Sequence, residues 1–313
     1  MKMNTNSKTN PATKSKKSIR FKSIVVPIDF SDTSLKALDY AITLANQFGS
    51  QLCLVHVLDF PTVFNTAQLP YAGWDQETKA QASERLATLI EEKVDALIPV
   101  TSKVILGRAF KSICDTARAQ KADLIVIGTH GFTGLKRLLL GSTAERVVRH
   151  APCSVLTIHS QHAKDAKITG KRRKILVPTD FSAPAEEALQ SAVEFALQFQ
   201  MKLQLLYVVP VHYSTGEYDA VDFAMLAVEQ KRSGQKHLAK ISQSLLAKKI
   251  AVTTKIRTGR PAMEIVEAAE EFDPDLIVIS THGVTGWRRA VLGSTTEEVV
   301  RHATCPVLIV RKK

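Results

Sequence analysis

The chain has 313 residues, of which 45% are hydrophobic and 23% charged, and its formal net charge is +12. This length and composition are typical of a globular protein with two domains, each large enough for a sizeable hydrophobic core. No apolar run approaches the roughly 20 residues of a membrane helix, no secretory signal begins the chain, and the four cysteines have no metal-ligand spacing, so we expect a cytoplasmic protein without transmembrane helices.

The positive charge lies mostly outside the predicted domains. Residues 1–22 contain seven Lys or Arg and no acid, residues 164–174 carry a net charge of +5, and the last three residues add +3. The rest of the chain is therefore slightly acidic. We interpret residues 1–20 as a disordered basic leader and predict no dedicated nucleic-acid surface, because the charge lies in a leader, a linker and a tail.

Strands and helices are predicted to alternate along the first half. Five mostly apolar, β-branched runs predict strands at 23–28, 51–58, 100–106, 123–127 and 154–158. Helical spacing of apolar residues predicts helices at 33–48, 76–96, 110–120 and 142–150. Strands this apolar are typical of a parallel sheet with helices on both faces, so the fold class is α/β, doubly wound. Such a sheet holds its ligand at the carboxyl ends of the strands, near a topological switch point.

The second half repeats the same order of elements. "VVPIDFSDTSLKALDYA" from Val25 aligns with "LVPTDFSAPAEEALQSA" from Leu176, at an offset of 151 residues, and Gly293 follows Gly141 at an offset of 152. Repeats of this length are complete domains rather than units of a solenoid. We therefore predict two tandem five-stranded domains over residues 21–159 and 174–313, joined by a polar linker at 160–173.

One glycine-spaced stretch is almost the same in both halves. "GTHGFTGLKRLLLGST" begins at Gly128, directly after the fourth strand, and "STHGVTGWRRAVLGST" begins at Ser280. Gly128 and Gly131 allow a sharp turn and a close ligand approach. After nine further residues, Gly141 opens a helix whose free N–H groups and dipole favour a phosphate. The pattern is neither a Walker A loop nor a Rossmann fingerprint, so it predicts a phosphate site of another kind.

A purely structural interpretation stays open for parts of this stretch. Ser142-x-x-Glu145 and Ser294-x-x-Glu297 fit capping boxes, in which the serine hydroxyl serves its own helix. Ser280 departs from the glycine of the first copy. It weakens the second site if the position needs a positive φ or a close ligand approach, and it costs little if its φ is negative.

The stretch resembles the ATP-binding motif of the universal stress protein family, which is G-x-x-G, nine residues, then G-S or G-T, after an apolar strand. "VPIDFS" and "VPTDFS", "LVHVLD", and "LGRA" and "TGRP" are similar to the same family. The resemblance covers residues 20–160 and 172–311. It implies a tandem member of the family, with an adenine nucleotide alpha hydrolase-like fold in each half.

The resemblance also implies an ATP site in each half, for which AMP or ADP are alternative ligands and Mg²⁺ would enter through the phosphates. In the first half it assigns adenine and ribose contacts to Pro27, Ile28, Asp29 and Val57, ribose and phosphate contacts to Gly128, Thr129, His130, Gly131, Phe132, Thr133 and Gly134, and β- and γ-phosphate contacts to Gly141, Ser142, Thr143 and Ala144. The matching positions of the second half are Pro178, Thr179, Asp180, Val208, Ser280, Thr281, His282, Gly283, Val284, Thr285, Gly286, Gly293, Ser294, Thr295 and Thr296.

The roles of some of these residues have alternatives. Asp29 suits a hydrogen bond from a ribose hydroxyl or an adenine amine, or it caps the following helix. We interpret His130 and His282 as loop-stabilising rather than catalytic, because no carboxylate or nucleophile lies at a suggestive spacing beside them. No base for hydrolysis is evident. We therefore predict a nucleotide-binding regulatory protein with no catalytic residue and no metal site of its own, whose ATP hydrolysis is slow and incidental at most.

Two other function classes compete with this interpretation. A scaffold of the same fold that binds no nucleotide is the alternative. An adenylyl-transferring enzyme is disfavoured, because neither an S-G-G-x-D-S loop nor an H-I-G-H-like pair follows the first strand. The last strands, "CSVLTIHS" and "CPVLIVRK", would leave apolar sheet edges open. The family pairs these edges between subunits, so the two halves are expected to pair within this chain, and a homodimer of whole chains stays open.

Overall fold

The computed structural model describes residues 21–59, 74–129, 140–159, 173–211, 219–281 and 292–311. The first half contains β1 (Ser23–Pro27), α1 (Asp32–Phe48), β2 (Gln51–Leu58), α2 (Trp74–Lys93), β3 (Val100–Leu106), α3 (Ala109–Ala119), β4 (Leu124–Gly128), α4 (Ser142–His150) and β5 (Ser154–Ile158). The second half contains β6 (Lys174–Pro178), α5 (Ala183–Phe199), β7 (Lys202–Pro210), α6 (Asp219–Ala247), β8 (Val252–Gly259), α7 (Pro261–Phe272), β9 (Leu276–Ser280), α8 (Ser294–His302) and β10 (Val307–Val310).

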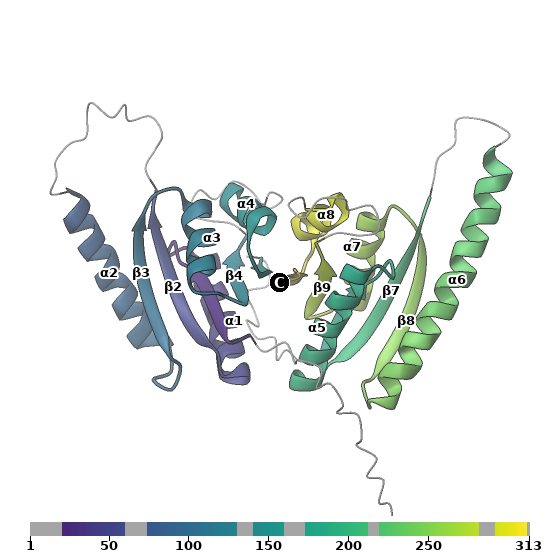
Figure 1. Ribbon diagram of the computed structural model, residues 1–313, viewed down its shortest axis with the longest axis horizontal. Helices are drawn as coiled ribbons and strands as arrows, with labels where there is room; N and C mark the ends of the chain where they lie inside the picture. The colour runs from purple at the N-terminus through teal and green to yellow at the C-terminus, as the bar shows by residue number, and fades with distance from the viewer. Residues whose placement is uncertain are drawn as a thin grey trace, which may run out of the picture.

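The strands of both halves form one ten-stranded sheet, in the order β3-β2-β1-β4-β5-β10-β9-β6-β7-β8 (Figure 1). Within each half all neighbouring strands are parallel, which confirms the predicted α/β fold with a five-stranded parallel sheet in each repeat. The halves meet where β5 and β10 pair antiparallel, with Leu156 opposite Leu308. The expected pairing within one chain is therefore present.

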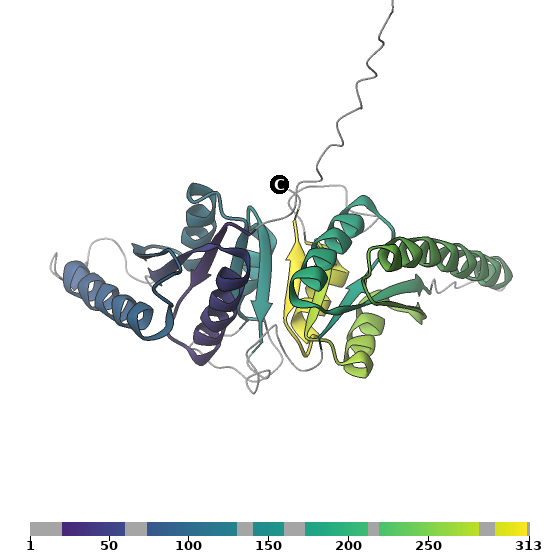
Figure 2. The same ribbon diagram turned by 90° about the horizontal axis from the view of Figure 1, so that it is seen from below.

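Two hydrophobic layers cover the two faces of the sheet and continue across the junction. Alternate residues of a strand point to opposite faces, so Ile24 and Val26 belong to one layer and Val25 to the other. The first layer includes residues of α1, α2, α5 and α6, and the second includes residues of α3, α4, α7 and α8. Figures 1 and 2 show α4 and α8 above the junction and α1 and α5 below it.

An aromatic cluster joins the halves beneath the sheet. The ring of Phe195 lies 5.7 Å from that of Phe21 and 5.6 Å from that of Phe48, both in edge-on geometry. Beside it, the side-chain amide of Gln47 donates to the backbone carbonyl of Gln198 (3.2 Å), and Gln198 donates in return to the carbonyl of Gln47 (2.9 Å). Reciprocal contacts between equivalent residues are typical of a two-fold interface. The junction therefore has the geometry of a two-fold interface between subunits, although both halves belong to one chain.

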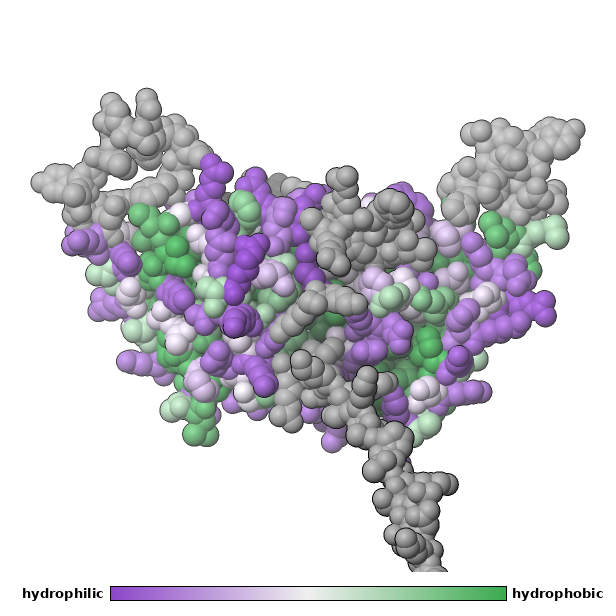
Figure 3. Space-filling model, in the orientation of Figure 1, coloured by the Kyte–Doolittle hydropathy of each residue, from purple (hydrophilic) through white to green (hydrophobic). Residues whose placement is uncertain are grey.

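The surface mixes polar and apolar residues, as Figure 3 shows for the face seen in Figure 1. Among the described residues, no helix has the length and apolar character needed to cross a membrane. The four cysteines are buried and unbridged.

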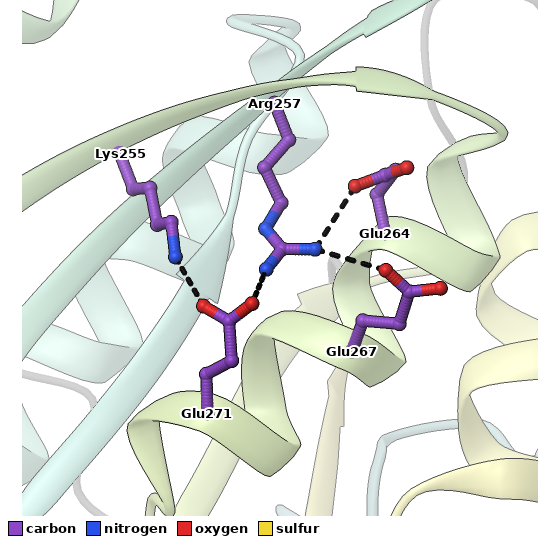
Figure 4. Close-up of polar contacts among 5 residues, drawn as sticks. All are labelled: Lys255, Arg257, Glu264, Glu267 and Glu271. Carbon is purple, nitrogen blue, oxygen red and sulfur yellow. Dashed lines mark hydrogen bonds and ion pairs between the residues drawn. The ribbon is translucent and has the colours of Figure 1, made fainter.

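Charged residues cover the strand at one edge of the sheet, β8. Arg257 pairs with Glu264 (3.0 Å), Glu267 (3.1 Å) and Glu271 of α7, and Lys255 also pairs with Glu271 (Figure 4). These partners, Lys255 first, hold the pKa of the Glu271 carboxyl below its usual value. Charges along an edge strand hinder its pairing with another chain. The cluster therefore helps to end the sheet at β8.

A glycine in the middle of α6 makes room for a tyrosine of β7. Gly234 lies inside a 29-residue helix, where glycine costs about 1 kcal/mol relative to alanine. A Cβ at Gly234 would lie 2.4 Å from Cδ1 and 2.5 Å from Cε1 of Tyr207. The matching residues of the first half are Ala82 and His56. The half with the larger ring, Tyr207, thus has the smaller helix residue, Gly234, beside it.

We expect Gly234→Ala to lower the free energy of unfolding, because overpacking strain of about 1–3 kcal/mol exceeds the roughly 1 kcal/mol gained in helix propensity. Adding Tyr207→His should recover most of the loss, since it recreates the residue pair of the first half. Urea unfolding of the single and double variants measures both effects. A single variant more stable than the original chain would contradict the close contact.

Candidate functional site

A pocket lies at the carboxyl ends of β1 and β4, where the strand order of the first half reverses direction. It encloses about 730 Å³ of space outside the protein atoms, a volume that includes its opening to solvent. All the predicted first-half residues that the structure describes line it, namely Pro27, Ile28, Asp29, Val57, Gly128, Thr129, Gly141, Ser142, Thr143 and Ala144.

Sequence reasoning missed five further lining residues, which are Ser34, Val55, Ala109, Ile113 and Ile127. These residues could have been found from their positions, because the pocket is built from the ends of the predicted strands and the starts of the helices that follow them. Ten predicted residues, 130–134 and 282–286, lie outside the described residues. Lys136, Arg137, Arg288 and Arg289, which are basic residues of the same two stretches, lie outside them too.

The start of α4 presents backbone N–H groups to the pocket. Gly141 occupies the N-cap position, and its own N–H donates to the carbonyl of Thr129 at 2.7 Å. The first bond within the helix runs from the N–H of Glu145 to the carbonyl of Gly141 at 2.9 Å. The N–H groups of residues 142–144 therefore have no acceptor among the described residues. Three amide donors and the positive end of the helix dipole converge on the pocket wall.

The capping-box interpretation of α4 and α8 is wrong. Gly141 and Gly293 are the N-caps, so Ser142 and Ser294 stand one position inside their helices, and neither helix has a side-chain cap bond. A capping box needs its serine at the N-cap itself. The hydroxyls of Ser142 and Ser294 therefore do not cap their own helices.

The end of β1 forms the opposite wall of the pocket. The N–H of Ile28 donates to the carbonyl of Val55 at 2.8 Å, and Nδ1 of His56 lies 2.7 Å from the carbonyl oxygen of Ile28. Asp29 follows, exposed at the pocket rim. This wall combines apolar strand ends with one carboxylate.

Asp29 supports a helix cap without being the cap. The N-cap of α1 is Ser31, whose hydroxyl accepts a hydrogen bond from the N–H of Ser34 at 3.3 Å. Oδ1 of Asp29 in turn accepts from the N–H of Ser31 at 3.0 Å and from its hydroxyl. The other carboxylate oxygen has no partner among the described residues, so it can still accept a bond from a ligand.

A phenylalanine in a left-handed conformation turns the chain after each of these aspartates. Phe30 has φ 62° and Phe181 has φ 63°, a conformation that costs about 1–3 kcal/mol. Packing holds them there, because Arg85 lies 3.9 Å over the Phe30 ring and Phe181 lies 4.8 Å from the ring of Tyr207. Burial, and then the nearby charge of Asp180, raises the pKa of Tyr207. No local sequence signal marks either phenylalanine.

The second half repeats these arrangements. The N–H of Thr179 donates to the carbonyl of Leu206 at 2.8 Å, and the N–H of Gly293 donates to the carbonyl of Thr281 at 2.9 Å. Oδ1 of Asp180 accepts from the N–H of the helix cap Ser182 at 3.0 Å, as Asp29 does in the first half. The described part of the second half therefore has the same polar plan at the same strand and helix ends.

The glycine-to-serine difference between the halves is explained by packing rather than by a positive φ. Neither Gly128 nor Ser280 is in the left-handed region, and Ser280 pairs with Val310 as the last residue of β9. A Cβ at Gly128 would lie 3.0 Å from the carbonyl carbon and oxygen of Thr33, at the start of α1. Glycine at 128 thus allows α1 to approach, and Ser280 carries no left-handed strain.

Two stretches of the chain, 20–159 and 171–311, match the family model described as the universal stress protein family. A universal stress protein of Methanocaldococcus jannaschii is 37% identical over 140 residues, which cover 45% of this chain and 82% of the relative. One of Mycobacterium tuberculosis is 27% identical over 300 residues, covering 92% and 97%. A universal stress protein structure from Archaeoglobus fulgidus has a TM-score of 0.68 at 20% identity, covering 95% of this chain and all of that one.

We expect Gly128→Ser to lower the free energy of unfolding by about 1–3 kcal/mol, because its Cβ would crowd the backbone of Thr33. The matched control is Ser280→Gly, which should cost no more than about 1 kcal/mol, the usual cost of glycine in a strand. Urea unfolding of both variants measures the difference. Equal losses would show that the contact with α1 does not explain the glycine.

Proposed function

Because the chain belongs to the universal stress protein family, we propose that it is a stress-response regulatory protein that binds ATP in the pocket between β1 and α4. Nucleotide occupancy would then control the conformation or the assembly of the chain. The observation that carries this proposal is the row of three amides at the start of α4 that have no acceptor among the described residues and face a pocket whose far wall is the end of β1. AMP or ADP would use the same pocket with fewer phosphates.

The phosphates would lie at the start of α4. The amides of residues 142–144 supply donors, and the helix dipole adds a partial positive charge that favours an anion. The exposed Ser142 hydroxyl and the partly exposed Thr143 hydroxyl offer further donors beside the amides. We assign the contacts of residues 130–134 from the family motif alone.

The adenosine would lie against the strand ends. Val55, Val57 and Ile127 form apolar wall at the carboxyl ends of β2 and β4, which suits the faces of a purine ring. Asp29 keeps one carboxylate oxygen for a ribose hydroxyl or the adenine amine. The repeated polar plan supports a second ATP site in the other half, built from the matching residues.

Magnesium would enter with the phosphates rather than through a protein site. No cluster of three or more His, Cys, Asp or Glu suited to a metal occurs within the ranges that the structure describes, and Mg²⁺ commonly binds through nucleotide phosphates. We propose a cytoplasmic location, which the four buried free thiols support. Homodimerisation of the whole chain is part of the proposed response to nucleotide, and it would use surfaces other than β5 and β10, which are already paired within the chain.

The sharpest test of ATP binding replaces one amide donor without breaking the helix. Proline at the first helical position is well tolerated and removes only an N–H. Gly141 already has φ −59° and ψ 142°, the extended conformation that a following proline requires. We expect Ser142→Pro to weaken ATP binding at the first-half site by about 10-fold or more, the usual effect of a lost hydrogen bond to a charged group.

Ser142→Ala is the control, since it keeps the amide and should bind far more tightly than the proline variant. Ser294→Pro is the matched substitution in the second half, where Gly293 has φ −65° and ψ 142°. Titration calorimetry with ATP and Mg²⁺ measures each site. If the original chain binds no adenine nucleotide, the scaffold hypothesis replaces this proposal.

ATP hydrolysis should be slow, because the described pocket lining contains no histidine and its one carboxylate, Asp29, lies at the end opposite the amides. Glu145, which follows the amides, is paired with Arg149. Single-turnover assays with purified protein measure the rate. Rapid turnover that is lost in Gly131→Ala would show that the protein is an ATP-hydrolysing enzyme.

A further inference from the structure

The two helices whose starts form the proposed phosphate sites lie side by side across the junction. α4 begins at the first-half pocket and α8 at the matching place in the second half (Figure 1). In each helix a glutamate, Glu145 or Glu297, directly follows the first three amides, which have no acceptor within the described parts of the chain. A carboxylate so close to a bound phosphate would repel it unless a cation neutralises the carboxylate.

A single arginine neutralises both glutamates. Nη2 of Arg149 lies 3.4 Å from Oε1 of Glu145 in its own helix and 3.1 Å from Oε2 of Glu297 in the other half. Glu297 is also 3.4 Å from Arg301, through its other oxygen. The four side chains are between 25% and 36% exposed, so solvent screens their charges only in part. They form a continuous ionic chain from one candidate site to the other.

The far end of α4 is also held by the second half. Nη2 of Arg311 donates to the carbonyls of Val148 (3.0 Å) and Arg149 (3.1 Å), which are the last-turn acceptors of α4. The backbone N–H of Arg311 donates to the hydroxyl of Ser154 at 3.2 Å. A cation at a helix C-terminus complements the helix dipole. The second half therefore contacts the last turn of α4 twice, through the Arg149 side chain and through the final carbonyls of the helix.

From this arrangement, and resting on the function proposed above, we infer that the two nucleotide sites are negatively coupled through Arg149. Phosphates bound at the start of α4 repel Glu145, which then holds Arg149 more tightly. Arg149 then neutralises the charge of Glu297 less completely. The negative charge of Glu297 therefore opposes phosphate binding at the start of α8. Phosphates bound at the start of α8 weaken phosphate binding at the start of α4 in the same way, because coupling between two sites is reciprocal.

The coupling can be measured with full-length protein, ATP and Mg²⁺ at low salt, where ionic contacts are least screened. Ser294→Pro weakens the second-half site, so the tighter binding step of that variant reports the first-half site, and the tighter step of Ser142→Pro reports the second-half site. The product of the two dissociation constants of the original chain should exceed the product of these single-site constants by about fivefold or more, the usual lower range of such coupling.

Substitutions in the ionic chain locate the coupling. Arg149→Gln, combined in turn with each proline substitution, should bring the ratio of the products close to one. Glu297→Gln breaks the same contact from the other helix and should do the same, which covers the case in which one variant fails to fold. Arg301→Gln is the control. It removes a contact with Glu297 within the second half, and it keeps the contacts of Arg149 with both glutamates.

Each outcome has a distinct meaning. A ratio of one in the original chain, or an unchanged ratio in both Arg149→Gln and Glu297→Gln, overturns this inference and leaves the proposed function intact. Binding of only one ATP per original chain overturns the inference too, since only one site then exists. Absence of ATP binding in the original chain and all variants refutes the proposed function itself.

Discussion

The antiparallel pairing of β5 with β10 is the interaction on which the rest of the structure depends. It turns two parallel five-stranded sheets into one sheet and leaves no apolar edge at the centre. Leu156 and Leu308 are fully buried there, and the hydroxyl of Thr157 donates to the carbonyl of Val307 at 3.3 Å. Because this pairing relates the halves by an approximate two-fold axis, it also brings α4 and α8 together and places equivalent residues against each other.

The candidate site depends on how a few backbone groups are used. The N–H of Gly141 is bonded to the carbonyl of Thr129, and this bond ties the start of α4 to the end of β4. The next three amides have no such partner among the described residues, and so they are available to an anion. On the other wall, Ser31 caps α1 and Asp29 supports it with one oxygen only. Each wall therefore has the hydrogen bonds that hold its helix start in place, and each still has polar groups that can bind a ligand.

The two halves keep this plan while their packing has diverged. The second half has Tyr207 beside Gly234, where the first has His56 and Ala82. It also has a buried threonine at 296, whose hydroxyl donates to the carbonyl at the end of β9 at 2.8 Å, where the first half has alanine. Such exchanges conserve the backbone path, because interiors tolerate substitutions that keep the total volume. The halves therefore share the aspartate-supported caps of α1 and α5 and differ in the contacts made around them.

The sequence alone determined the duplication, the α/β fold of each half and the strand and helix ends from which the pocket is built. These are local properties: β-branched apolar runs, helical spacing and the glycines before Ser142 and Ser294 are visible within a few residues. Only the tertiary structure decided that Gly128 faces α1, that Phe30 adopts a left-handed conformation and that Arg149 bridges to the other half. The physical reason is that these depend on contacts between residues as much as 148 positions apart, as Arg149 and Glu297 are, which no local pattern records.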